Sequence, residues 1–200
     1  MKKLTLISAA LALSAVLAAP AQAAAVRDGA SFMANTLAAN DDLSTGNVGL
    51  GFGINFFGQN FSSLWVNNNG NVTFDSALGT FTSFPLNGTS REILAPFFGD
   101  VDTRVGNVVT YGATMLAVKN VFGVNWIDVG YFSQQTNKRN SFQLIITERS
   151  DIAAGDFDFE FNDDQILWET GGASGGVNGL GGSSARMGWS NGAANTYEQA

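Results

Sequence analysis

Residues 93–104 read Ile-Leu-Ala-Pro-Phe-Phe-Gly-Asp-Val-Asp-Thr-Arg, and this stretch decides the fold. Its first half is apolar and aromatic, and its second half holds the carboxylates Asp100 and Asp102, followed by Arg104. Residues two apart on an extended backbone point to one face, so the pattern predicts a buried strand, Ile93 to Val101, that ends in paired acids. Such an end lies at the rim of a sheet, where loops carry function.

The two neighbouring acids require a positive partner, because like charges this close repel each other. We expect Arg104, together with backbone donors, to satisfy Asp100 and Asp102. The alternative is a calcium ion at Asp100 and Asp102, completed by Asp41, Asp42 or a loop carbonyl, since calcium takes about 6–8 oxygen ligands. The candidate binding residues are therefore Asp41, Asp42, Asp100, Asp102 and Arg104.

Short apolar runs with a period of two recur along the chain, separated by turn signals. The clearest hairpin joins Phe61–Val66 to Asn71–Asp75 through Asn67–Gly70, because Asn-Gly supplies the positive φ of a tight turn. Further strands are expected at Val48–Phe57, Val108–Tyr111, Val118–Val129, Ser141–Glu148, Asp156–Phe161, Ile166–Trp168 and Ala185–Ser190. The sequence thus predicts an all-β fold, an antiparallel β-sandwich of roughly ten short strands.

Large side chains in the inward phase of these strands define the expected core: Phe97, Trp126, Phe142, Phe159 and Trp189. Residues 76–92 form an expected loop with three apolar side chains tucked beneath it: Phe81, Phe84 and Leu86. The acids that alternate with aromatics in residues 156–161 indicate a solvated outer face; the alternative is a cation-binding stripe. The Gly-rich residues 170–183 lack the Lys-Ser/Thr of a phosphate loop and predict a mobile surface loop.

The N-terminus has the three parts of a secretory signal peptide: a basic head at residues 1–3, an apolar run at residues 4–19 and Ala21-Gln22-Ala23 as cleavage site. The alternative is an uncleaved N-terminal anchor. We expect cleavage after Ala23, export, and no insertion of the mature chain in a membrane. Residues 24–40 would then form a short helix or loose arm, and residues 41–200 one β domain.

Composition excludes several kinds of chemistry. The chain has 200 residues without cysteine or histidine, so it has no thiol nucleophile, no Ser-His-Asp triad and no His or Cys zinc site. Removal of Lys2 and Lys3 leaves 17 acidic residues against 8 of the 10 basic ones, a net charge of −9. Such a surface repels nucleic acid, so no nucleic-acid partner is expected. Only oxygen ligands remain for a metal, which favours calcium and implies no other cofactor.

A series of motifs, in order from Asp41 to Trp189, resembles the nidogen-like (NIDO) domain family. The matching segments are Ile54–Gly58, Leu64–Phe74, Pro96–Arg104, Val124–Trp126, Val129–Tyr131, Asn140–Leu144, Ile166–Gly171 and Ala185–Ser190. The resemblance implies an extracellular module of cell–matrix adhesion without catalysis, and the Ala-rich signal peptide is typical of a secreted bacterial member. The expected partners are extracellular proteins or glycans.

Two other functions remain open at this point. One is a glycan-cleaving enzyme that uses paired carboxylates, for which Asp100, Asp102 and Glu169 are available. The other is a purely structural surface-layer component. We expect the adhesion module and no enzyme, because carboxylate pairs at sheet ends are more often structural or metal-bound.

Overall fold

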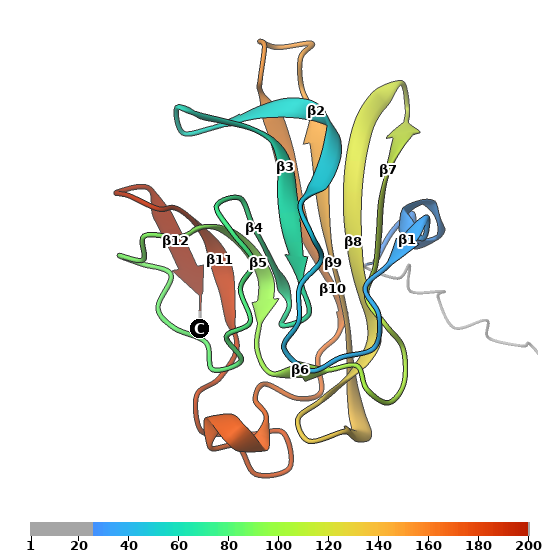
Figure 1. Ribbon diagram of the computed structural model, residues 1–200, viewed down its shortest axis with the longest axis vertical. Coiled ribbons are helices and arrows are strands. Elements are labelled where there is room, and N and C mark those ends of the chain that lie inside the picture. Colours follow the sequence, from blue (N-terminus) through green and yellow to red (C-terminus); the bar gives the residue numbers. More distant parts are fainter. Residues whose placement is uncertain (1–25, 200) are drawn as a thin grey trace, which may run out of the picture.

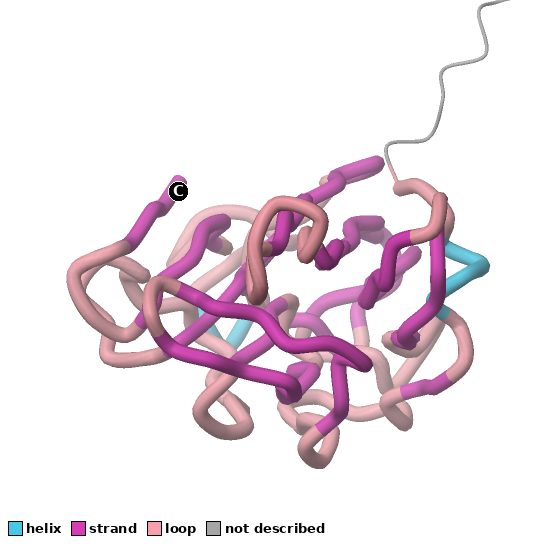
Figure 2. Tube along the Cα trace, turned by 90° about the horizontal axis from the view of Figure 1, so that it is seen from above, coloured by secondary structure: helices cyan, strands magenta, loops and turns pink. Residues whose placement is uncertain are grey.

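The computed structural model describes residues 26–199, and its regular structure is almost all β-strand, joined by loops and turns (Figures 1 and 2). The expected signal peptide, residues 1–23, lies outside the described residues. The strands are β1 (Asn35–Thr36), β2 (Val48–Phe56), β3 (Gln59–Asn67), β4 (Asn71–Thr73), β5 (Glu92–Phe98), β6 (Val101–Asp102), β7 (Thr110–Leu116), β8 (Lys119–Tyr131), β9 (Gln135–Glu148), β10 (Phe157–Gln165), β11 (Arg186–Asn191) and β12 (Thr196–Gln199). Two 3₁₀ turns complete them, η1 (Gly29–Phe32) and η2 (Gly172–Ser174).

The strands form two antiparallel sheets that pack face to face. The first sheet has the order β1-β7-β8-β9-β10, with β6 paired to β8. The second sheet has the order β12-β11-β5-β4-β3-β2. The predicted antiparallel β-sandwich is therefore confirmed. The chain enters the first sheet, crosses to the second for β2–β5, returns for β6–β10, and ends in the second.

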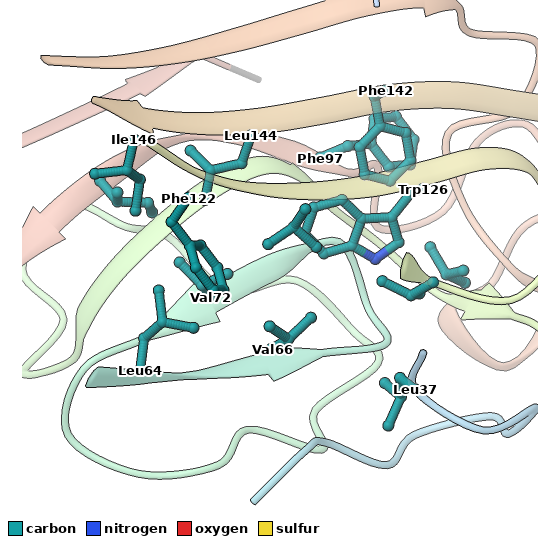
Figure 3. Close-up of a cluster of buried hydrophobic side chains, with 14 of the residues drawn as sticks. Leu37, Leu64, Val66, Val72, Phe97, Phe122, Trp126, Phe142, Leu144 and Ile146 are labelled. Carbon is teal, nitrogen blue, oxygen red and sulfur yellow. The ribbon is translucent and has the colours of Figure 1, made fainter. Parts of the chain in front are cut away.

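The core lies between the sheets, where side chains of β8 and β9 meet those of β3 and β4 (Figure 3). Trp126 stacks on Phe142 with ring centroids 5.2 Å apart, and Phe97 contacts Phe142 at 5.0 Å. All three are buried, as predicted. Phe159 and Trp189 are only partly buried, which corrects the sequence expectation. Phe159 lies on the edge strand β10, so one side of its ring has no neighbouring strand.

The hairpin predicted around Asn-Gly is confirmed as β3–β4. Gly70 has a φ of 75°, and a Cβ there would lie 1.8 Å from the carbonyl oxygen of Phe97. The position therefore requires glycine for both its backbone conformation and its close approach to β5. The turn is not a solvated loop, because Asn67, Asn68 and Asn69 are each at most 1% exposed.

The predicted central strand Ile93–Val101 is interrupted. β5 ends at Phe98 in the second sheet, and β6 begins at Val101 in the first sheet. Between them the Val101 N–H donates to the Gly99 carbonyl at 2.9 Å, which forms a tight turn. The chain thus changes sheets at Gly99-Asp100. The extended backbone that would place both acids on one face does not exist there.

Other differences arise where tertiary packing overrides the local pattern. Phe81 is 37% exposed, whereas Leu86 is fully buried as expected. Residues 166–168 form no strand, because the backbone N–H groups of Leu167 and Trp168 donate to the side-chain oxygen of Asn140 instead of to another strand. The N-terminal Phe32 packs with Val121 and Ile145 on the outer face of the first sheet, which explains the small residue at Gly123.

Candidate functional site

Four segments that are distant in sequence converge at one end of the sandwich, at the lower end of Figure 1. They are the stretch before β2, the β3–β4 turn, the link between β5 and β6, and the connection that follows β10. They bring together Asp41 and Asp42, Asn68 and Asn69, Asp100 to Arg104, and Gly171. The structure therefore gathers every residue that the sequence proposed for the site.

Asn68 is the residue that joins these segments. Its Nδ2 donates to the carbonyl oxygens of Asp41 and Val101, each at 2.6 Å. Its Oδ1 lies 2.9 Å from the Thr103 hydroxyl. Its carbonyl accepts a hydrogen bond from the indole N–H of Trp126 at 3.0 Å, so the site is connected to the centre of the core. A buried amide with all these partners fixes the chain segments relative to one another.

Asp102 and Arg104 form a closed ion pair. The Arg104 side chain donates from Nε to Oδ1 at 2.9 Å and from Nη2 to Oδ2 at 2.5 Å. The backbone N–H groups of Arg104 and Gln134 donate to the same two oxygens at 3.0 and 2.7 Å. Burial alone would raise the pKa of Asp102, but the hydrogen bonds from Arg104 and Gln134 outweigh it and lower this pKa. The expected Arg104 clamp is therefore present on Asp102.

Asp100 has a different environment from Asp102, although only one residue separates them. Its side chain is 2% exposed, and its Oδ2 has no hydrogen-bond partner. One oxygen each of Asp41, Asp42 and Asp100 lies within 4.8 Å of the others. Arg104 reaches this group only through Asp41 Oδ2, at 3.0 Å. The predicted acid pair Asp100–Asp102 is thus replaced by two separate arrangements, a clamped Asp102 and a three-carboxylate cluster.

Two members of the cluster, Asp41 and Asp100, have a raised pKa. Burial raises the pKa of Asp100 to about 7, and the charges of Asp41, Asp42 and Asp102 add to this effect against Arg104. Burial also raises the pKa of Asp41 to about 6, with further contributions from Asp102 and Asp42. Burial and neighbouring negative charge therefore disfavour the ionised forms of Asp41 and Asp100 unless a cation joins them.

Gly171 closes the cluster from the other side. A Cβ at this position would lie 2.1 Å from Asp100 Oδ2, so the backbone of the Gly-rich segment rests directly on the carboxylate. The predicted mobile surface loop is in part buried, because Thr170 and Gly171 have little exposure. Glu169, proposed as an enzymatic acid, instead accepts the Gly181 N–H at 2.7 Å.

Sequence reasoning missed the asparagines of the site. Asn69 donates from Nδ2 to Asp42 Oδ1 at 2.9 Å, while its own Oδ1 is buried without a partner. Asn67 joins Asn71 and Thr73 in the same network. Three successive asparagines before Gly70 are more than one tight turn needs, and this excess was the available signal.

Three cavities in the described part of the chain have volumes of about 670, 580 and 410 Å³. None is lined by Asp41, Asp42, Asp100 or Asp102. The smallest lies beside the site, between Phe132, Gln135 and Gly172. The Phe132 N–H donates to the Asp100 carbonyl at 3.2 Å, so this depression and the cluster share a wall.

The fold and the site define a β-sandwich module whose loop end is built from acids and asparagines. The family profile described as NIDO related matches residues 22–198. The chain belongs to the NIDO-related family, which bears out the resemblance seen in the sequence.

Curated relatives agree with this assignment. Alpha-tectorin of Mus musculus is 33% identical over 179 residues, covering 76% of this chain and 8% of the relative. Alpha-tectorin of Gallus gallus is 31% identical over the same length, and nidogen of Drosophila melanogaster is 27% identical over 150 residues, 61% of this chain and 11% of the relative. The chain thus spans about a tenth of these relatives. No solved structure matches it.

Within residues 26–199, no helix has the length and apolar character needed to cross a bilayer.

Proposed function

We propose that this chain is a secreted matrix module of cell–matrix adhesion, which binds an extracellular protein or glycan at the loop end of the sandwich. The observation that carries the proposal is membership of the NIDO-related family, together with similarity to alpha-tectorin and nidogen. The expected signal peptide and the acidic composition are consistent with export. We also propose that the chain is of bacterial origin.

The depression beside the site is the binding surface that we favour. It has a volume of about 410 Å³ and combines the ring of Phe132 with the amides of Gln135 and Asn178. Rings and amides together suit the apolar faces and hydroxyl groups of a sugar, or the side chains of a peptide. The guanidinium of Arg104 lies 5.7 Å from the centre of the Phe132 ring, which orients that ring at the rim.

The test is binding of the purified mature domain to arrays of glycans and matrix proteins. We expect a specific ligand whose binding is lost in Phe132→Ala and kept in Tyr197→Ala, which removes an exposed aromatic from β12. Melting curves of both variants serve as the control for folding. Equal binding by the two variants would place the partner on another surface, and binding to no member of either array would contradict the proposal.

The enzymatic alternative has less support. A glycosidase needs two carboxyl groups that flank a substrate, about 5–10 Å apart and accessible. Asp102 is held by Arg104 and Gln134, Asp100 is buried, and Glu169 is engaged by Gly181. Release of reducing sugar from an array glycan by the wild-type domain, abolished in Glu169→Gln, would favour this alternative.

The structural alternative, a surface-layer component, differs from the module in its partner, which would be further copies of the chain. Light scattering over a range of protein concentrations separates the two. Ordered self-assembly without affinity for any glycan or matrix protein would favour the surface-layer component.

A further inference from the structure

The carboxylates at the loop end are poorly balanced by positive charge. Arg104 is the cation that forms ion pairs with Asp41 and Asp102, and in the described part of the chain neither Asp42 nor Asp100 has a salt bridge. Four carboxylates therefore share one guanidinium. A group of this charge needs either protons or a further cation in order to be stable when it is partly buried.

The geometry of the cluster matches a single small cation. Calcium binds oxygen at about 2.3–2.6 Å, so ligands on opposite sides of the ion are about 4.6–5.2 Å apart. One carboxylate oxygen from each of Asp41, Asp42 and Asp100 lies within 4.8 Å of the other two. One ion would therefore reach all three without a change in the course of the chain.

Unpartnered oxygens give an independent indication of a ligand. Asp100 is 98% buried, yet its Oδ2 accepts no hydrogen bond, whereas the Oδ2 of the equally buried Asp102 accepts from Arg104 and Gln134. Asp41 Oδ1 and Asn69 Oδ1 are also buried without partners. Buried polar atoms in native proteins nearly always have a partner. Three buried oxygens without a partner in one cluster therefore indicate a bound cation.

We propose that Asp41, Asp42 and Asp100 bind one calcium ion, with the amide oxygen of Asn69 as a further ligand. The chain contains neither histidine nor cysteine, and a set of carboxylate and amide oxygens selects a hard cation. Calcium tolerates an irregular shell of protein oxygens from several loops, whereas magnesium requires a near-octahedral shell and retains its waters. Asp102 is not a ligand, because Arg104 and Gln134 occupy its oxygens.

The ion would join parts of both sheets. Asp42 lies in the segment before β2 and Asn69 in the β3–β4 turn, so both adjoin the second sheet, whereas Asp100 lies where the chain crosses to the first. Calcium would replace electrostatic repulsion between these segments by shared coordination. It would thus stabilise the loop end, including the wall that the cluster shares with the Phe132 depression.

The test is a calcium titration of the full mature domain after dialysis against chelator. Extracellular modules bind calcium with a Kd of about 10⁻⁴–10⁻³ M. At calcium concentrations of about 100 times Kd, a site in a domain of this size raises the melting temperature by about 5–10 °C. Calorimetry should give one site per chain, and magnesium at the same concentration should have a much smaller effect.

The variants decide which residues carry the response. Asp100→Asn and Asp42→Asn should both lose it, and the second, at a partly exposed position, answers the question if the first fails to fold. Asp163→Asn is the matched control, because Asp163 Oδ1 is likewise buried without a partner but lies outside the cluster. No shift at about 10 mM calcium would overturn the proposal. A shift that persists in both cluster variants, or an equal response to magnesium, would also overturn it.

The calcium titration and the array-binding test can fail independently of each other. A domain that responds to calcium but binds no array ligand would keep the metal site and refute the adhesion function. A domain that binds its array ligand but shows no calcium-dependent melting shift would keep the adhesion function and refute the metal site.

Discussion

Substitution of Gly171 by alanine tests the contact between the Gly-rich segment and the acidic cluster. Gly171 has a φ of −93°, a conformation open to any residue, so backbone strain plays no part. The effect comes from space alone, because the new Cβ would lie 2.1 Å from Asp100 Oδ2 and 2.6 Å from its Cγ. Ordinary contact begins at 3.4 Å, so one group has to move by about 1.3 Å (3.4 minus 2.1 Å).

The expected cost is that of overpacking a buried site, about 1–3 kcal/mol in the free energy of unfolding. For a domain of this size that lowers the melting temperature by roughly 2–12 °C. Gly172→Ala is the control in the same loop: Gly172 is exposed and the nearest atom to its added Cβ is 4.0 Å away. This variant should melt within about 1–2 °C of the wild-type domain, as surface substitutions do.

A double-mutant cycle identifies the group that causes the clash. In the Asp100→Ala background, Gly171→Ala should cost clearly less, because the carboxylate that it meets is gone, and the two substitutions should couple by about 0.5–3 kcal/mol. Chemical denaturation with a fixed denaturant slope is a suitable assay. If Gly171→Ala were as stable as Gly172→Ala, or if its cost were the same without Asp100, the close approach described here would be wrong.

Three further predictions concern the core, a second buried acid and the N-terminus. Phe142→Ala should cost about 3–5 kcal/mol and Phe159→Ala clearly less, because only the first is fully buried; equal costs in denaturant melts would contradict the burial of these rings. Burial raises the pKa of Asp163, so its ionisation weakens the folded state as the pH rises above the ordinary carboxyl range. Asp163→Asn should therefore stabilise the domain at neutral pH and lose this advantage in acid, and a gain confined to acid would reverse the argument. N-terminal sequencing of exported protein should begin at Ala24, and a mature form that retains residues 1–23 would show that the signal peptide is not cleaved.

The sequence predicts the strands well where one local pattern decides their conformation. The alternation of Leu50, Phe52, Ile54 and Phe56 is a strand pattern whichever neighbour it pairs with, and all four side chains are buried. Asn-Gly likewise fixes the β3–β4 turn through the backbone conformation of Gly70.

Features that depend on partners distant in sequence are not predictable in the same way. The run is apolar before Gly99 and alternates acids with Val101 after it, and nothing in it shows that β5 and β6 belong to different sheets. The separation of Asp100 from Asp102 follows from that crossing, as does the use of Gly171, which lies some seventy residues further along the chain. The sequence could identify the acids as a group but not the roles that the fold assigns to each.

During synthesis, β5 receives its two neighbouring strands at very different times. One neighbour of β5 is β4, which precedes it closely, but the other is β11, which is synthesised about ninety residues later. Until Arg186–Asn191 has left the ribosome, β5 offers a free hydrogen-bonding edge along a strand in which every residue after Glu92 is destined for the interior. Such an edge pairs readily with another nascent chain. Folding without aggregation therefore depends on β11, near the end of the domain, which covers the exposed edge of β5.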